Sequence, residues 1–337
     1  MNSKVLVPKN YSSDLSLKET AIAIKKIKDF FENKLATELN LTRVSAPLFV
    51  KSSTGLNDDL NGIERPVSFD MKALKDTKIE IIHSLAKWKR NALKEYNFNV
   101  GEGLYTDMNA IRRDEDLDNI HSIYVDQWDW EKIILESERT NDTLESIVKT
   151  IFSVFKETEN YITSIYPTIE KKLPEKIFFI TAEELYQKYP NLSPKEREHA
   201  ICKEKKAVFI KSIGGLLSYG DKHDGRSPDY DDWTLNGDLL FYYPLLDQGL
   251  ELSSMGIRVN SKSLLYQLEQ SNCLERKNLP FHKDLLNGKL PCTIGGGIGQ
   301  SRICMFFLNK AHIGEVQSSI WDDETVKICK ENHINLL

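Results

Sequence analysis

The first clear pattern along the chain is a stripe of apolar residues at helical spacing, formed by Ile24, Ile27, Phe31 and Leu35. A capping box at Ser16 and Glu19 precedes the stripe, so we predict a long amphipathic helix over residues 17–38. The helix leads into an extended segment over 42–49, whose Pro47 suits an edge or interface strand better than a central one. We expect this helix and strand to form a dimer surface.

The rest of the chain alternates between helical and extended periodicity. Helices are expected over residues 83–96, 143–166, 182–188, 194–205 and 299–308. Strands are expected over residues 79–82, 121–131, 177–180, 208–210, 238–243 and 250–254, and the polar stretch 57–70 is expected to be a loop. The period of two in 121–131 places Val125, Gln127 and Asp129 on one face of a strand. Since no repeat, low-complexity tract or linker interrupts the pattern, we expect one domain over residues 1–337.

Composition narrows the class of protein without changing this outline. Apolar residues make up 40% of the 337 residues and charged residues 28%, which is typical of a globular chain. The net charge of -5 provides no basic field for nucleic acid. Five cysteines without a CxxC pair suit a reducing compartment. The chain shows no signal peptide and no apolar run of membrane-spanning length, so we expect a cytoplasmic protein without membrane or nucleic-acid partners.

A glycine-rich segment at 294–302, with the sequence IGGGIGQSR, is the most informative candidate for chemistry. A dinucleotide-binding loop needs Gly-x-Gly-x-x-Gly, but Gln300 and Arg302 occupy the two possible last positions. A phosphate-binding loop fails as well, because no Gly-Lys-Ser/Thr follows. We interpret the segment as a turn that enters a helix, where the backbone can approach a flat ligand and Arg302 can meet phosphate charge. A purely structural turn is the alternative.

A second candidate is the segment 111–116, IRRDED, which leads into the predicted strand 121–131. An arginine at a strand end, followed by a returning antiparallel strand, can hold a triphosphate through bidentate contacts, although such a segment taken singly can be a solvated turn. Three features then follow in order: the helix and strand with Pro47, Arg112 with its hairpin, and the GxGxGxxR segment. Together they resemble motifs 1, 2 and 3 of the class II aminoacyl-tRNA synthetase catalytic fold.

A fourth segment, ELSSMGIR at 251–258, resembles the Glu-x-Gly-Gly-Gly-x-x-Arg stretch of aspartyl-type synthetases, although serines replace two glycines here. Five further stretches, together with IGGGIGQSR, extend the likeness to residues 15–325: HSLAKWKR, GEGLY, SIYVDQWDWE, PDYDDW and LNGD. With them, the chain resembles the aspartate–ammonia ligases, the type A asparagine synthetases. The resemblance implies a homodimer whose class II synthetase-like core is a mixed, mainly antiparallel sheet flanked by helices, an α/β (α+β) fold, without an anticodon-binding domain.

The implied reaction has two steps. ATP activates the side-chain carboxylate of aspartate as a β-aspartyl-adenylate, and ammonia then gives asparagine, with AMP and pyrophosphate as the other products. Free ammonia is the expected nitrogen donor, because glutamine-dependent asparagine synthetases begin with a nucleophilic cysteine in an added amidase domain, whereas Asn2 stands here. ATP and Mg²⁺ are the implied cofactors, since crowded phosphate oxygens need cations placed in advance.

The resemblance also assigns roles at the reacting end of the site. Arg112 is expected at the α-phosphate, and Gln127 is expected to donate a hydrogen bond to the carbonyl oxygen as it gains charge. Asp58 is expected to be the base that takes the proton from ammonium, whereas neighbouring Asp59 suits an ordinary acidic turn. Asp231 is a further site residue and the next candidate for the base.

The other expected roles concern the two substrates and the metal ion. For the amino acid, Asp129 is expected to bind the α-ammonium, and the expected contacts to its carboxylate are Lys89, Arg258, Ser84 and Ser254. For ATP, the expected ligands are Arg112, Glu115, Asp238, Glu251 and Arg302. Asp238 and Glu251 are the expected Mg²⁺ ligands, since hard cations take oxygen donors. We expect a solvated helix face at Lys87 and Arg90, and structural roles for His83 and His121.

Two other functions share much of this sequence pattern. One is a synthetase-like protein that binds nucleotide, amino acid or RNA without forming an amide, but the presence of every candidate charge from Asp58 to Arg302 argues against it. The other is a true aminoacyl-tRNA synthetase, which requires a tRNA-binding module and a basic surface that this sequence does not provide.

Overall fold

The computed structural model describes residues 5–58, 60 and 64–337. The described residues form a central eight-stranded sheet in the order β1-β5-β6-β11-β10-β9-β8-β7. Its strands are β1 (Leu41–Arg43), β5 (Gly103–Ile111), β6 (Tyr124–Ile133), β7 (Phe178–Thr181), β8 (Ala207–Lys211), β9 (Asp231–Tyr243), β10 (Gln248–Arg258) and β11 (Thr293–Gly299). Only the two outermost pairs, β1–β5 and β7–β8, are parallel. The expected mixed, mainly antiparallel sheet is therefore confirmed.

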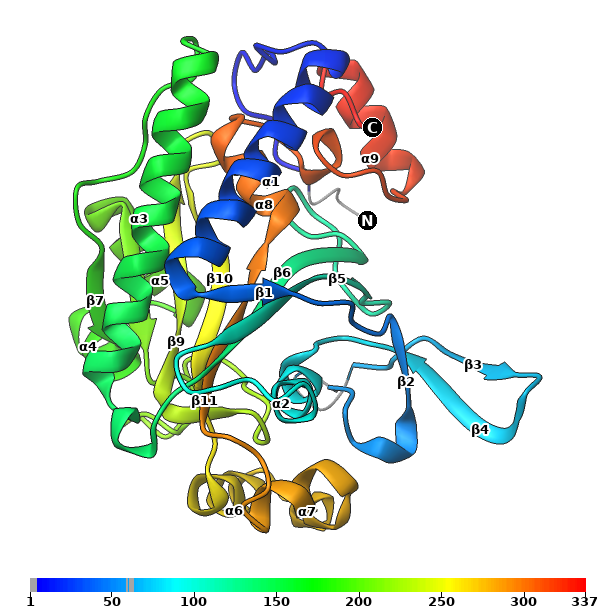
Figure 1. The fold of residues 1–337 in the computed structure, drawn as a ribbon. Coiled ribbons are helices and arrows are strands. Elements are labelled where there is room, and N and C mark those ends of the chain that lie inside the picture. The colour runs from blue at the N-terminus through cyan, green and yellow to red at the C-terminus, as the bar shows by residue number, and fades with distance from the viewer. Residues whose placement is uncertain (1–4, 59, 61–63) are drawn as a thin grey trace.

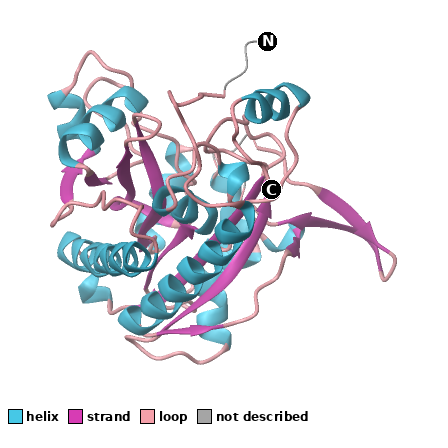
Figure 2. Ribbon diagram, turned by 90° about the horizontal axis from the view of Figure 1, so that it is seen from above, coloured by secondary structure: helices cyan, strands magenta, loops and turns pink. Residues whose placement is uncertain are grey.

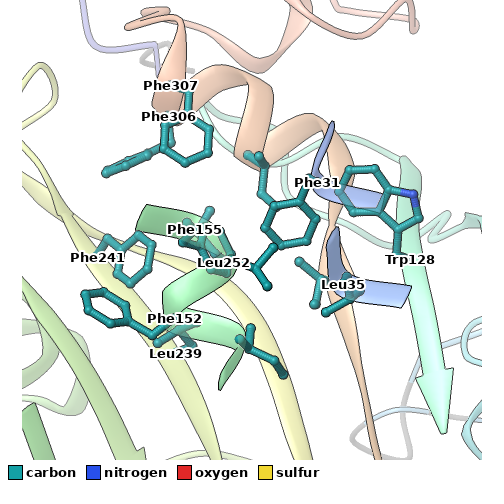
Figure 3. Packing of buried hydrophobic residues seen from close by; sticks show 14 of the residues in the cluster. Phe31, Leu35, Trp128, Phe152, Phe155, Leu239, Phe241, Leu252, Phe306 and Phe307 are labelled. Carbon is teal, nitrogen blue, oxygen red and sulfur yellow. The ribbon is translucent and has the colours of Figure 1, made fainter. Parts of the chain in front are cut away.

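One face of the sheet is covered by α1 (Leu17–Leu39), α3 (Asn141–Ile165) and α8 (Gln300–Phe307) (Figure 1). Phe31 of α1 lies between Trp128 of β6 and Phe155 of α3, with ring centroids 5.0 and 4.8 Å apart (Figure 3). Ile27, Phe31 and Leu35 are fully buried in this core. Most of the apolar stripe of the first helix therefore packs within the chain.

The opposite face of the sheet carries the polar side chains. Side chains alternate along β6, so that Trp128 and Trp130 enter the core whereas Gln127 and Asp129 point the other way. Three helices pack against strands of the large sheet in this part of the molecule: α2 (Ala86–Glu95), α4 (Ala182–Lys188) and α5 (Pro194–Lys205). Because α2 packs against β6 and β11, it brings its lysines to the polar face.

Two smaller units extend from this body. A three-stranded sheet in the order β2-β4-β3 is formed by β2 (Phe49–Lys51), β3 (Ser68–Met71) and β4 (Leu74–Ile81), and its β3–β4 hairpin projects outward (Figure 2). The helices α6 (Ser261–Gln270) and α7 (Pro280–Leu286) lie together at the base of the sheet (Figure 1). A last helix, α9 (Asp323–Glu331), packs its Cys329 with Ala311 and Ile334 in a small apolar cluster. No helix in the described part of the chain is long and apolar enough to cross a membrane.

Most predicted elements are observed, with three corrections. Residues 57–70 are not entirely loop, since β3 starts at Ser68 and pairs with β4. The extended segment 42–49 is the end of β1, a connection that contains Pro47, and the start of β2; β1 is an edge strand of the large sheet. The glycine-rich segment is a regular central strand, not a turn, and helix α8 begins only at Gln300. Three helices were not predicted, namely α6, α7 and α9, which are short and start after Asn260, at Pro280 and after Asp322.

Candidate active site

Two adjoining cavities lie on the polar face of the sheet. The larger has a volume of about 390 Å³ and the smaller of about 80 Å³. The larger cavity is lined by Glu115, Glu251 and Arg302, and the smaller by Ser84, Asp129, Asp231 and Arg258. Arg112, Gln127 and Ser254 line both cavities. The structure therefore brings ten of the predicted site residues together, and three of them stand where the two cavities meet.

The glycines of β11 leave room for the polar side chains of β6. Gly297 and Gly295 pair in register with Asp129 and Glu131. A Cβ atom on Gly297 would overlap the amide oxygen of Gln127, and one on Gly295 would overlap the carboxylate of Glu131. These glycines thus have a steric role within a regular strand, which corrects the interpretation of a flexible turn.

A buried ion cluster forms the floor of the smaller cavity. Arg258 donates to Glu131 at 2.9 and 2.7 Å and also bonds to Asp231. Lys89 bonds to Asp129, and its Nζ lies 3.8 Å from Glu131. Burial by itself would raise the pKa of Glu131, but Arg258 and Lys89 outweigh this effect and hold that pKa below its ordinary value. The cluster contains three carboxylates and two cations, so it suits a substrate that brings its own ammonium group.

Lys89 lies deeper than expected. It lines neither cavity, is fully buried, and donates to the backbone oxygens of Trp130 at 2.9 Å and Gly296 at 3.2 Å. Burial lowers its pKa although Asp129 and Glu131 act in the opposite direction. In this structure Lys89 therefore contacts Asp129, while Arg258 lines the cavity itself.

Arginines gather at the larger cavity. Arg302 donates to the backbone oxygen of Glu251 at 2.9 Å, which fixes its guanidinium at the cavity wall. The Nε atom of Arg112 is buried and has no hydrogen-bond partner among the described residues. Arg226 and Lys195 line the same cavity. Acidic side chains line this cavity as well, but arginines with planar guanidinium groups suit contacts to a polyphosphate.

Asp238 and Glu251 lie on the neighbouring strands β9 and β10. Asp238 bonds to Arg226 and does not line either cavity, whereas Glu251 lines the larger one. Burial raises the pKa of Asp238 to about 7; Arg226 opposes this shift and Glu251 adds to it. The described residues contain no cluster of three or more histidine, cysteine or acidic side chains arranged to hold a metal ion. Two carboxylates do fit Mg²⁺, which takes few protein ligands and completes its shell with water and phosphate oxygens.

Asp58 is buried near the cavities without lining either of them. Its carboxylate accepts a hydrogen bond from the backbone N–H of Leu60 at 3.0 Å, and its backbone oxygen lies 3.0 Å from Nδ1 of His83. Burial raises the pKa of Tyr230, and the charge of Asp58 adds to that rise. Asp59 lies outside the described residues.

The expectation of a solvated helix face at Lys87 and Arg90 is wrong. Lys87 is buried and bonds to Asp229 at 3.1 Å. Arg90 is also buried and donates to the backbone oxygens of Val259 at 2.7 Å and Pro291 at 2.8 Å. Burial lowers the pKa of Arg90 to about 10. The cause is tertiary, because α2 packs under the sheet with polar partners on more than one side.

Several residues of the site were not singled out from the sequence. Tyr230 lines both cavities, and Arg226 and Lys195 line the larger one. Tyr230 was visible within the PDYDDW stretch between two acidic residues, but Arg226 and Lys195 stand in polar segments without a distinguishing pattern. The two histidines left as structural, His83 and His121, both line the larger cavity, and His121 lies 2.9 Å from the carboxylate of Asp118.

Comparison with known proteins gives one consistent family. A family model described as aspartate-ammonia ligase matches residues 18–333. The chain is 69% identical over 334 residues to the aspartate–ammonia ligase of Clostridium perfringens strain SM101. The aligned residues cover 99% of each chain. The chain is 64% identical over 337 residues to the aspartate–ammonia ligase of Ruminiclostridium cellulolyticum, and the aligned residues cover 100% of each chain.

Solved structures with a similar fold are class II aminoacyl-tRNA synthetases. The asparaginyl-tRNA synthetase from Pyrococcus horikoshii complexed with asparaginyl-adenylate has a TM-score of 0.64 at 14% identity, covering 88% of this chain and 68% of that one. The Entamoeba histolytica asparaginyl-tRNA synthetase in complex with asparaginyl-adenylate has a TM-score of 0.62 at 13% identity, covering 89% and 66%. The chain thus spans about two thirds of the length of these synthetases. The likeness confirms the expected class II core.

Proposed function

The chain belongs to the aspartate–ammonia ligase family, and we propose that it forms L-asparagine from L-aspartate and ammonia with ATP, through a β-aspartyl-adenylate. One observation carries the proposed geometry. The large cavity, which Arg112, Arg226 and Arg302 help to line, and the small cavity floored by an ion cluster meet at Arg112 and Gln127. ATP in the first and aspartate in the second would place the α-phosphorus and the side-chain carboxylate next to each other.

In the first step, a side-chain oxygen of aspartate attacks the α-phosphorus, and the bond to the β-phosphate breaks as pyrophosphate leaves. Negative charge then accumulates on the phosphate oxygens. Arg112, at the junction of the cavities, neutralises the charge at the α-phosphate, and Arg302 holds another part of the nucleotide. Glu115 lines the same cavity and completes the proposed ATP contacts.

Aspartate is held by the polar side chains of the smaller cavity. Asp129 and Asp231 accept from the α-ammonium, and Arg258 binds the α-carboxylate, with Ser84 and Ser254 as hydrogen-bonding neighbours. Lys89 acts from beneath, because its ammonium fixes the carboxylate of Asp129. This arrangement modifies the expected role of Lys89, which contacts Asp129 in the structure rather than the cavity.

In the second step, ammonia attacks the acyl carbon, the bond to AMP breaks, and one proton is released. Gln127 donates a hydrogen bond to the carbonyl oxygen as it becomes negative. Asp58 attracts ammonium and takes its proton. The effect of the Asp58 charge on the pKa of Tyr230, which lines both cavities, supports this role, although the Asp58 carboxylate must reach the junction of the cavities.

Mg²⁺ would be held by Glu251 together with Asp238, and it would neutralise phosphate charge when bound.

Further properties of the protein extend the same proposal. Residues 1–337 work as one class II synthetase-like catalytic unit, and two copies form a homodimer. It acts in asparagine biosynthesis in the cytoplasm and has no nucleic-acid partner, as its net charge of -5 favours.

The test is a product assay with protein, aspartate, ATP, Mg²⁺ and ammonium. The expected products are asparagine, AMP and pyrophosphate in equal amounts. ADP and phosphate in place of AMP and pyrophosphate would rule out the adenylate. Pyrophosphate exchange without asparagine would favour a synthetase-like protein that forms no amide.

A further inference from the structure

Gln267, on helix α6 outside the catalytic sheet, contacts the segment that supplies Tyr230 and Asp231 to the smaller cavity. Its amide oxygen accepts from the backbone N–H of Trp233 at 2.9 Å. Its Nε2 donates to the backbone oxygens of Pro228 and Asp231, both at 2.9 Å. One side chain thus joins three points of a six-residue stretch.

The orientation of this amide is fixed by its partners. A backbone N–H can only donate and a backbone oxygen can only accept, so the amide cannot be turned over without losing all three bonds. Gln267 is 2% exposed, so water does not replace these bonds. Both N–H donors of the Gln267 amide and its oxygen acceptor are therefore engaged in hydrogen bonds to the backbone.

The neighbouring contacts hold the same segment from a second side. Asp229 is fully buried and accepts from Lys87 at 3.1 Å, His282 at 2.9 Å and Ser227 at 2.8 Å. The segment 228–233 is therefore held between α2, α6 and α7. In between, Asp231 reaches Arg258, and little space remains, because a Cβ atom on Gly256 would lie 2.8 Å from the Asp231 carboxylate.

We propose that Gln267 is a positioning residue for the aspartate subsite. It sets the backbone of 228–233 so that Asp231 meets both Arg258 and the α-ammonium of aspartate. This inference rests on the proposed function, since it takes the smaller cavity as the place of the amino acid. The α6–α7 unit thereby has a defined task in binding one substrate, while the ATP contacts lie on other elements.

The experiment compares Gln267→Leu with Gln270→Leu, an exposed glutamine at the end of the same helix. Initial rates are measured while aspartate is varied at saturating ATP and ammonium, and again while ATP is varied. For Gln267→Leu we expect KM for aspartate to rise about tenfold or more, because a small misplacement of a binding group has large effects. KM for ATP should stay within about twofold, and Gln270→Leu should match the wild type.

An unchanged KM for aspartate in folded Gln267→Leu protein, or an equal rise for both substrates, would overturn the inference. If Gln267→Leu does not fold, Gln267→Glu serves instead, because it keeps its size and the acceptor for Trp233. Its carboxyl can donate to one backbone oxygen only when protonated. The aspartate KM of this variant, relative to wild type, should fall as pH is lowered, and a ratio independent of pH would also overturn the inference.

Failure of the inference and failure of the proposed function give different results. If the wild type makes no asparagine under any condition, the proposed function is wrong. If the wild type makes asparagine and only the expected change in KM for aspartate is missing, the proposed function stands and the role of Gln267 is wrong.

Discussion

At the scale of single residues, the arginines of the larger cavity are the most direct test of the chemistry. Arg112→Ala or Arg302→Ala removes a positive charge from the expected site of the phosphates. We expect each variant to form the adenylate about a hundredfold more slowly or worse, as is typical when one electrostatic donor is lost from a preorganised site. The measurement is pyrophosphate release in a single turnover.

Arg43→Ala is the matched control, because Arg43 is an exposed arginine paired with Asp107 and lines neither cavity. It should release pyrophosphate at the normal rate. Normal release by both Arg112→Ala and Arg302→Ala would show that the phosphates bind elsewhere.

Asp58 separates the two chemical steps. Asp58→Asn should still bind ATP and aspartate and form the adenylate, because its charge is not needed at the α-phosphorus. Asparagine formation should fall steeply and its pH optimum should rise, since the deprotonation of ammonium then depends on solvent. Pyrophosphate release and asparagine formation are measured in the same single turnover.

The exposed Asp70→Asn in β3 is the control for Asp58→Asn and should behave as wild type. A folded Asp58→Asn protein that no longer binds aspartate would make Asp58 a positioning residue. The base would then be sought at Asp231, which lines the smaller cavity.

At the scale of elements, the close packing of β11 glycines against β6 side chains predicts that a larger residue in β11 will lower activity. Gly297→Ala places a methyl group where the amide oxygen of Gln127 lies, so Gln127 must move. We expect asparagine formation to slow by about tenfold to a hundredfold, because Gln127 acts at the reacting carbonyl. The fold should persist, since the obstacle is the end of a side chain.

The control is Gly215→Ala, where an added Cβ atom meets nothing within 4 Å. Rates of the two alanine variants are compared after circular dichroism shows that both are folded. Equal, normal rates would mean that Gln127 can move without loss, and its proposed role at the carbonyl would be wrong.

Because His312 caps a short buried turn, we expect the free energy of unfolding to depend on pH. This ring is fully buried, accepts from the backbone N–H of Gly314 at 3.0 Å and packs against Trp321. Burial lowers the pKa of His312 from 6.5 to about 4. Between these values the unfolded chain binds more protons, so the free energy of unfolding should fall as pH falls from 6.5 to 4, by about 1 kcal/mol per pH unit.

Urea denaturation at pH 5 and pH 7 measures this effect. His312→Gln should show a smaller difference between the two pH values than the wild type. His199→Gln, at a half-buried histidine of α5, should keep the wild-type difference. The same difference in all three proteins would assign the pH dependence to other groups.

At the scale of the whole molecule, the structure changes the argument for the proposed homodimer. The stripe of α1 is buried within the chain, but Leu48 and Phe49 beside Pro47 are 48% and 43% exposed. Phe69 of β3 packs edge-on against Phe49, at 5.3 Å between ring centroids. We expect a dimer in sedimentation at micromolar concentration, with this patch in the interface.

Phe49→Asp should weaken the dimer, because a carboxylate would enter an apolar contact. Ile320→Asp, at a side chain 76% exposed elsewhere, should leave the association unchanged. A wild-type monomer at micromolar concentration would contradict the proposed dimer, and an unaffected dimer of Phe49→Asp would place its interface on another surface.

The sequence by itself determined the elements and the order of the motifs. The alternation along 121–131 placed Gln127 and Asp129 on one face of a strand, and the apolar stripe placed a helix over residues 17–38, because both patterns are local to a few residues. The three ordered motifs pointed to the family.

Only the tertiary structure decided what each element faces. Lys87 and Arg90 looked like a solvated face, but α2 packs under the sheet and buries both. The glycines of β11 suggested a turn, yet they make room for side chains more than 160 positions away in the sequence. The contacts of Gln267 likewise join segments more than 30 residues apart. Such contacts depend on how the strands pair and where the helices dock, and no local pattern of residues encodes either.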